Sequence, residues 1–259
     1  MKQPLSVVII TKNEETNLRG CLESVCNLAD EIVVVDSNSS DQTQNIAQEY
    51  GATVHITDDW PGFGIQKNRA VSLAKNDWIL SIDADERVTP ELSKEISDLL
   101  QDQPKCQVYK ISRLSWYCGR FIKHSGWHPD YVLRLFNRQS ARFSDDLVHE
   151  RVLYDGEVHL LRSPLLHYSF LNFSQVLSKV DRYSSASAEQ LYLRGKKASL
   201  LSAVGHGFWA FIRTYIFQAG FLDGSHGFAL AVSNAEGTYY RYLKLWLFIQ
   251  QRGPCLKNS

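Results

Sequence analysis

The sequence predicts an α/β fold with a doubly wound, mostly parallel sheet, a small antiparallel extension and a C-terminal helical segment. Short apolar runs recur at residues 5–10, 32–35 and 78–82, as is typical of parallel strands buried on both faces, and residues 53–56 are predicted as a further strand. Segments with helical spacing separate these runs. Such alternation indicates a parallel sheet with helices on both faces, and ligands bind these sheets at the carboxyl ends of the strands.

Each predicted helix has a local signal. Leu18, Leu22 and Val25 share one face of the segment after the first strand. After the second strand, Ser40 or Asp41 is expected to cap a helix. Residues 66–75 read as the third helix. The fourth is expected to begin after Thr89, with Pro90 at its first position, and to run through Leu100.

The pattern changes after Pro104. Residues 108–114 and 131–136 alternate apolar and polar side chains, which predicts antiparallel strands. From Phe173 onward the chain is expected to be helical. Residues 203–222 are long enough to span a membrane, but a central Arg213 would cost at least ~2.5 kcal/mol, so we expect no span. The predicted domains are residues 1–170 and 171–259.

Charge and aromatic residues are unevenly distributed. The net charge is zero, yet residues 1–170 carry 18 Lys+Arg against 24 Asp+Glu, and residues 171–259 carry 10 against 4. The segment 208–248 holds 12 of the 30 aromatic residues. Aromatic and basic residues together suit the headgroup region of an anionic membrane; an aromatic helical subdomain packed on the sheet is the alternative. We expect no nucleic-acid partner.

The five cysteines show no paired metal-ligand spacing. Their odd number and the lack of a secretory leader favour a reducing compartment, the cytosol.

The fourth predicted strand, residues 78–82, leads into the acidic sequence Asp83-Ala84-Asp85-Glu86. Side chains alternate along a strand, so Asp83 and Asp85 are expected to point the same way. Two converging carboxylates are costly unless a cation neutralises them, and oxygen ligands suit Mg²⁺ or Mn²⁺, which also hold substrate phosphates. A solvated turn is the alternative.

Other polar residues follow the first and second strands. Thr11 and Asn13 come after the first, and Asp36 and Ser37 after the second. These side chains and the acidic pair are expected at one edge of the sheet, which predicts a binding site there. No G-x-G-x-x-G follows the first strand, which argues against a dinucleotide-binding fold.

Three segments, residues 6–15, 32–41 and 78–86, resemble family 2 glycosyltransferases of the GT-A fold. Residues 127–136, residues 148–150 and His167 are similar to the subgroup that builds the inner core of bacterial lipopolysaccharide. The resemblance implies an inverting, metal-dependent transfer of a hexose, glucose from UDP-glucose, to a heptose of that core. Residues 171–259 match only loosely.

The resemblance also implies roles for particular residues. A divalent cation, Mg²⁺ or Mn²⁺, would bind Asp85 with help from Asp83, and His167 looks like a further ligand; a buried core histidine is the alternative. Glu150 is the expected base that deprotonates the acceptor hydroxyl, with Asp146 next in order and Asp145 third.

The remaining implied contacts concern the donor and the acceptor. The residues expected to hold the nucleotide sugar are Thr11, Asn13, Glu14, Asp36, Asp41, Lys67, Arg69 and Asp83. Lys67 and Arg69 would reach the phosphates or the sugar, although a solvated helix face explains them equally well. Asp130 and Arg134 are expected to bind sugar or acceptor hydroxyls, and a cross-strand ion pair between them is the alternative.

The expected acceptor is a lipid-anchored glycan, which places the enzyme peripherally on the cytoplasmic face of the inner membrane, at an anionic surface. Two other functions remain open. A Mg²⁺-dependent phosphatase could use Asp-x-Asp, but haloacid-dehalogenase-like enzymes place that pair after the first strand with Thr two positions on, where this chain has Arg87. A non-catalytic peripheral membrane module is the third reading.

Overall fold

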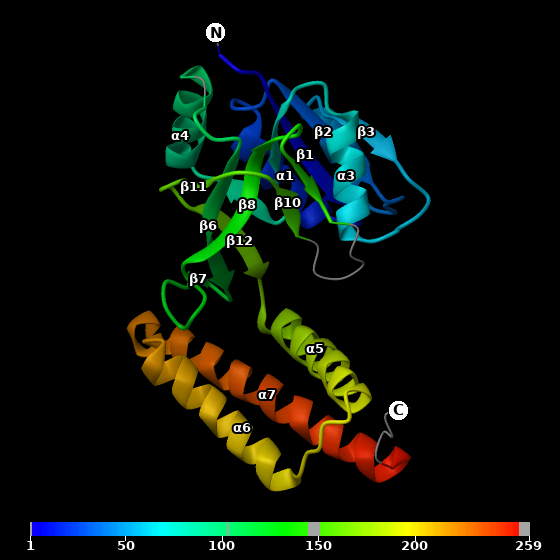
Figure 1. Ribbon diagram of the computed structural model, residues 1–259, viewed down its shortest axis with the longest axis vertical. Coiled ribbons are helices and arrows are strands. Elements are labelled where there is room, and N and C mark those ends of the chain that lie inside the picture. Colours follow the sequence, from blue (N-terminus) through cyan, green and yellow to red (C-terminus); the bar gives the residue numbers. More distant parts are fainter. Residues whose placement is uncertain (1, 103, 145–150, 254–259) are drawn as a thin grey trace. The chain divides into compact units, whose positions relative to one another are not determined.

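The computed structural model describes residues 2–102, 104–144 and 151–253. The chain forms two compact units (Figure 1). Unit 1 contains residues 1–114 and 130–167, and unit 2 contains residues 115–129 and 168–259.

The parallel part of the sheet is in unit 1. Its strands, in spatial order, are β3 (Thr53–Ile56), β2 (Glu31–Asp36), β1 (Leu5–Thr11) and β4 (Trp78–Ser81). Each neighbouring pair is parallel, and β1 and β4 are buried along their whole length. The predicted parallel strands are therefore confirmed.

Antiparallel strands extend this sheet beyond β4. They follow in the order β8 (Asp130–Asn137), β6 (Val108–Tyr117), β12 (Leu165–Phe170) and β5 (Glu86–Val88). β8 is antiparallel to both β4 and β6, as the alternating pattern predicts. Two short strands, β7 (Arg120–Phe121) and β11 (Val158–Leu160), also pair with β6, while β9 (Ala141–Phe143) and β10 (Val152–Tyr154) form a separate ribbon.

Helices cover both faces of the sheet (Figure 1). One buried cluster joins the sheet to α1 (Glu15–Val25), α2 (Thr43–Glu49) and α4 (Pro90–Gln101). A second cluster, which includes Ala70 and Val71, joins the other face to α3 (Phe63–Leu73). Thr89 caps α4 by accepting a hydrogen bond from the Leu92 N–H, as predicted. The sheet is therefore doubly wound.

The start of α2 differs from the sequence-based prediction. Its N-cap is Gln42, so neither Ser40 nor Asp41 caps the helix. Asp41 instead accepts hydrogen bonds from the Thr43 N–H at 3.0 Å and from the Glu15 N–H at 3.2 Å. Its carboxylate thus links the loop after β2 to the start of α1.

Unit 2 is built around three helices, α5 (Phe173–Leu193), α6 (Leu200–Ile212) and α7 (Gly224–Arg252). They lie side by side in Figure 1, and a π-helical turn (Arg213–Phe217) and a 3₁₀ turn (Gly220–Asp223) connect α6 to α7. Asp223 is buried and accepts hydrogen bonds from the Lys123 and His124 N–H groups, which ties residues 115–129 to this unit. Among the described residues, no helix combines the length and apolar character that crossing a bilayer requires.

Candidate active site

The acidic sequence after β4 forms a turn at the carboxyl end of that strand. β4 ends at Ser81, so Asp83 and Asp85 lie beyond the regular strand and its period-two alternation does not set their directions. Their carboxylates contact different partners. The strand alternation on which that expectation rests therefore does not extend to these two residues.

Asp83 is held between two cations. Its carboxylate lies 3.0 Å from the Lys67 ammonium of α3 and accepts a hydrogen bond from the Arg134 guanidinium of β8. Burial alone would favour the neutral acid, but the charges of Arg134 and Lys67 outweigh it and hold the pKa of Asp83 well below its usual range. Asp83 is therefore an anion with both oxygens engaged.

Glu86 is a fully buried acid that the sequence analysis did not single out. Arg134 donates to its carboxylate at 2.7 Å, and the Asp83 N–H donates to its other oxygen at 2.9 Å. Burial raises the pKa of Glu86, while Arg134 opposes that shift. Because the Asp83 carbonyl also accepts a bond from the Glu86 N–H, these contacts fix the shape of the acidic turn.

Asp85 contacts a histidine from a distant part of the sequence. The Nε2 atom of His167 lies 3.3 Å from an Asp85 carboxylate oxygen. Strand pairing causes this contact, because β12 is antiparallel to β5 and His167 is directly opposite Glu86, the residue after Asp85. The structure thus brings together the carboxylate and the imidazole that the resemblance implies as metal ligands.

The loops after β1 and β2 adjoin this turn at the same edge of the sheet. β1 lies between β2 and β4, and the Ile82 N–H donates to the Val8 carbonyl at 3.2 Å. At the end of β1, Thr11 donates to the buried Asp36 at 2.8 Å, and Gln44 donates to the same carboxylate at 2.7 Å. The Asp36 carboxylate therefore stabilises the loop that follows β2.

Asn13 and Glu14 follow β1 and face the same region. Asn13 adopts a left-handed conformation (φ 57°), which asparagine tolerates better than most residues, and its side-chain oxygen accepts a bond from the Ser40 N–H at 2.8 Å. Burial raises the pKa of Glu14, and the nearby charges of Asp85 and Asp41 add to the shift. The negative charge of the acidic turn therefore acts on the Glu14 carboxylate.

The other predicted contact residues separate into two groups. Lys67 is buried on Asp83, so the solvated-face alternative is wrong for it. Arg69 points to the exposed Asp59 and pairs with it at 2.6 Å. Asp130 pairs with Arg113 of β6 at 2.6 Å rather than with Arg134, so the predicted alternative of an ion pair between Asp130 and Arg134 is wrong.

A cavity of about 440 Å³ lies beside Asp83 in unit 1. Its walls come from α3, β6, β8, β9 and β10, with Phe143 and Tyr154 among the aromatic residues. Among the described residues, five cations line it: Lys67, Lys110, Arg113, Arg134 and Arg151. Lys110 and Arg113 were not predicted as site residues, although two basic side chains within the predicted strand 108–114 could have indicated them. This basic wall suits an anionic substrate.

Asp145, Asp146 and Glu150, the residues expected to act as the base, lie outside the described residues. Two described residues that bracket this segment, Phe143 and Arg151, both line the cavity.

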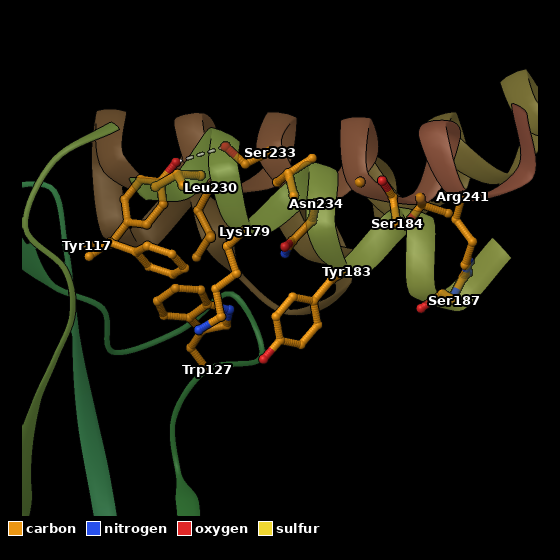
Figure 2. Close-up of a pocket in the computed structure, with 15 residues that line it drawn as sticks. Tyr117, Trp127, Lys179, Tyr183, Ser184, Ser187, Leu230, Ser233, Asn234 and Arg241 are labelled. Atoms are coloured by element: carbon orange, nitrogen blue, oxygen red, sulfur yellow. Dashed lines mark hydrogen bonds between the residues drawn. The ribbon is translucent and has the colours of Figure 1, made fainter. Parts of the chain in front are cut away.

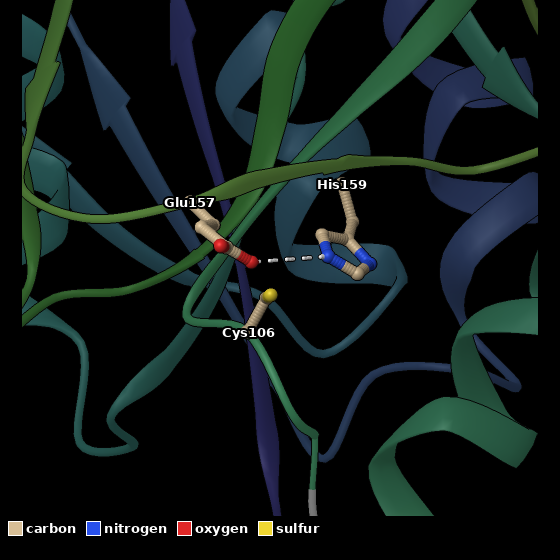
Figure 3. A group of neighbouring side chains, drawn as sticks. All are labelled: Cys106, Glu157 and His159. Carbon is tan, nitrogen blue, oxygen red and sulfur yellow. Dashed lines mark ion pairs between the residues drawn. The ribbon is translucent and has the colours of Figure 1, made fainter.

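A second group of metal-ligating side chains consists of Cys106, Glu157 and His159 (Figure 3). Their ligand atoms lie within 4.8 Å of one another, and Cys106 is buried while the other two are exposed. Cys106 lies two residues before Val108, the first residue of β6, which strand register places level with Ile79 near the beginning of β4. This group therefore lies at the opposite edge of the sheet from Asp83 and Asp85.

Several known proteins are similar to this chain. The chain is 33% identical to an uncharacterized glycosyltransferase of Rickettsia typhi over 93% of this chain and 86% of that protein. It is 30% identical to the lipopolysaccharide core biosynthesis glycosyltransferase LpsC of Rhizobium meliloti over 95% of this chain and 93% of that protein. Glucosyl-3-phosphoglycerate synthase from Mycobacterium tuberculosis, solved with Mn²⁺ and UDP, is 25% identical over 44% of each chain, with a TM-score of 0.37. Residues 6–169 match the family described as Glycosyl transferase family 2, and the chain belongs to that family.

Proposed function

We propose that the protein is a divalent-cation-dependent inverting glycosyltransferase that takes a hexose from a UDP-sugar. The observation that carries the proposal is the Asp85–His167 pair at the carboxyl end of β4, with a 3.3 Å separation between the two potential donor atoms. Adjacent ligands of an octahedral ion with bonds of about 2.1 Å lie about 3.0 Å apart. The pair therefore fits Mn²⁺ or Mg²⁺.

A bound divalent ion would neutralise charge on the diphosphate leaving group. The protein's own cations support this role. Lys67 and Arg134 hold Asp83 as an anion, so that carboxylate keeps the two cations at the wall of the cavity. Asp83 would then assist the site by positioning Lys67 and Arg134 rather than by binding the divalent ion as an unengaged ligand.

The proposed nucleoside contacts come from the loops after β1 and β2. Thr11, Asp36 and Asp41 use their side chains to shape those loops, as their hydrogen bonds indicate. Asn13 and Glu14 lie at the entrance to α1 beside them. We assign these residues to the donor site as a group, with Arg69 as its least supported member because it pairs with Asp59.

The donor and the acceptor follow from the resemblance and from the relative LpsC, whose name refers to lipopolysaccharide core biosynthesis. UDP-glucose is the proposed donor, and a heptose of the lipopolysaccharide inner core is the proposed acceptor. Glu150 is the proposed base, with Asp146 as the alternative. Arg134 lines the cavity, and Asp130 pairs with Arg113, which lines it as well; Asp130 and Arg134 are assigned to sugar or acceptor binding.

Donor binding with and without Mn²⁺ tests the proposal. We expect UDP to raise the melting temperature only when Mn²⁺ is present, and a donor screen on heptose-bearing truncated lipopolysaccharide should select UDP-glucose. Asp85→Asn and His167→Gln should each lower turnover at least 100-fold while the protein stays folded. Asp77→Asn is the matched control, because Asp77 lies at the other end of β4 and is exposed.

Full activity in excess chelator would refute the metal requirement. Release of phosphate from a phosphomonoester would indicate a phosphatase, an alternative that the family assignment does not support. Absence of both activities would favour the non-catalytic module.

We also propose that unit 2 binds peripherally to an anionic bilayer, on the cytoplasmic face of the inner membrane. Leu201, Val204 and Phe208 recur at helical spacing on α6 and are 82%, 52% and 68% exposed. Burying one Leu or Phe side chain contributes about 1.5–3 kcal/mol. The exposed Lys196 and Lys197 precede this helix, and cations near an anionic surface add about 1 kcal/mol each.

Liposome flotation tests this second proposal. Leu201→Ser/Phe208→Ser should reduce binding to all vesicles, and Lys196→Glu/Lys197→Glu should reduce binding to anionic vesicles in a salt-dependent way. Ile56→Ser, which removes an exposed apolar side chain from unit 1, is the control. No flotation of the unaltered protein would contradict the proposal.

A further inference from the structure

Unit 2 contains a cavity of about 280 Å³ between α5 and α7 (Figure 2). Its lining on α5 runs from Val176 to Ser187, and on α7 from Leu230 to Arg241. Each stretch covers eleven helical steps, or about 16 Å. The cavity is therefore long enough for an extended ligand of several rings.

One end of the cavity presents aromatic faces. Trp127 and Phe170 are stacked with ring centroids 6.0 Å apart, and Tyr117 meets both rings edge-on. The Tyr117 hydroxyl is fixed by its hydrogen bond with Ser233 at 2.9 Å. The Lys179 ammonium lies over the Phe170 ring at 4.7 Å, so we assign the contact with a sugar ring to the apolar surfaces of Trp127 and Tyr117.

Two cations line the cavity without a counter-ion. Lys179 and Arg241 make no ion pair or hydrogen bond with any residue that the structure describes, but each lies over an aromatic ring, Lys179 over Phe170 at 4.7 Å and Arg241 over Tyr242 at 4.9 Å. The buried Nε of Arg241 has no hydrogen-bond acceptor in the described part of the chain. Lys244, one turn further along α7, instead pairs with Asp181 at 2.6 Å. No carboxylate is among the described residues that line the cavity.

Buried donors without partners are costly, and a guanidinium matches the paired oxygens of a phosphate or carboxylate. Between the aromatic end and Arg241 the walls carry hydroxyl and amide groups, from Ser184, Ser187 and Asn234 (Figure 2). Ser184 already donates to the Asp181 carbonyl at 3.0 Å, and Asn234 donates to Thr214 at 3.3 Å. The acceptor atoms that remain on these side chains can bond a hydroxyl-bearing ring, whereas an acyl chain offers them no hydrogen bond.

We propose that this cavity binds a phosphorylated saccharide, with its rings against Trp127 and Tyr117 and its phosphate held by Lys179 or Arg241. The further statement that this saccharide belongs to the acceptor rests on the proposed function. Binding itself does not, because every lining residue belongs to unit 2.

Isothermal titration of the full chain tests the proposal with four probes: maltose 1-phosphate, maltose, inorganic phosphate and lysophosphatidic acid. We expect maltose 1-phosphate to bind at least tenfold more tightly than maltose or inorganic phosphate. Arg241→Gln and Lys179→Gln should each weaken that binding severalfold. Arg182→Gln is the matched control, since it removes an exposed cation from α5 that does not line the cavity.

Tighter binding of lysophosphatidic acid would identify a lipid site and overturn the proposal. Equal binding of maltose and its phosphate would overturn it as well, and so would absence of binding by every probe or equal losses in Arg182→Gln. Stabilisation by UDP and Mn²⁺ is measured on the same variants. If that stabilisation persists while saccharide phosphates fail to bind, the inference fails and the proposed function stands.

Discussion

Replacement of Arg134 by methionine should strongly destabilise unit 1. The Arg134 side chain is 6% exposed and holds two acids, Asp83 and the fully buried Glu86. Removal of one partner from a buried ion pair costs about 3–5 kcal/mol, and the cations that stay, Lys67 at 3.0 Å from Asp83 and Arg113 at 3.7 Å from Glu86, compensate the remaining charges only in part. We therefore expect the free energy of unfolding of Arg134→Met at pH 7 to fall by about that amount, measured by urea titration.

The size of this loss should depend on pH. Burial already raises the pKa of Glu86 against the opposing charge of Arg134, so loss of Arg134 should raise it further. A folded-state pKa above the unfolded value contributes stability at low pH that is lost as pH rises through the folded pKa. The difference between the natural protein and Arg134→Met should consequently grow from pH 5 to pH 8.

Two controls make this prediction specific. Arg69→Met removes a guanidinium from an exposed pair with Asp59, where water screens the charges, so its stability should stay near that of the natural protein. Glu86→Gln/Arg134→Met removes the stranded acid and should recover at least half of the loss. A loss below about 1 kcal/mol, or one independent of pH, would refute the reasoning.

Further predictions concern the same site. Arg134 and Lys67 hold the pKa of Asp83 low against the effect of burial. Asp83 therefore contributes stability that is present above about pH 4 and is lost as pH falls further. Asp83→Asn should reduce the fall in melting temperature below about pH 4, and an unchanged fall would contradict the prediction. Glu150→Gln should lower transfer roughly 10²–10⁴-fold with donor affinity nearly unchanged; if Asp146→Asn shows that pattern instead, the base is Asp146.

The parallel half of the sheet could be predicted because most of its strands are recognisable from a few consecutive residues. The apolar runs at β1, β2 and β4 and the Thr89–Pro90 start of α4 each lie within a few consecutive residues. The exact start of α2 could not be predicted in this way. The Asp41 side chain could either cap α2 or bind another part of the chain, and in the structure it accepts a hydrogen bond from the Glu15 N–H.

The environment of the acidic turn could not be derived from local sequence. β5 has three residues, too few for a recognisable pattern, and its pairing with β12 is what places His167 beside Asp85. Asp130 and Arg134 share a strand, yet each pairs with a different element. Such partners depend on strand order, which residue spacing does not encode.

The charges around the turn divide into two sets. Lys67 and Arg134 balance Asp83 and Glu86 through contacts of 3.0 Å or less. Lys67, Arg134 and Glu86 are at most 6% exposed and Asp83 is 32% exposed, and each of the four groups has a partner within the fold. They form a rigid support whose net charge is close to zero, so the turn keeps its shape whether or not a ligand is present.

Asp85 and Glu14 remain outside that balanced set. The pKa of Glu14 is raised by burial and then by the negative charge of Asp85, which means that the two carboxylates repel each other in the structure as it stands. A divalent cation would carry a charge equal and opposite to this pair, and His167 offers it a nitrogen ligand beside Asp85. The same ion would then meet a diphosphate at the edge of the sheet where the loops after β1 and β2 converge. Charge balance and strand register thus favour the same position for the cation.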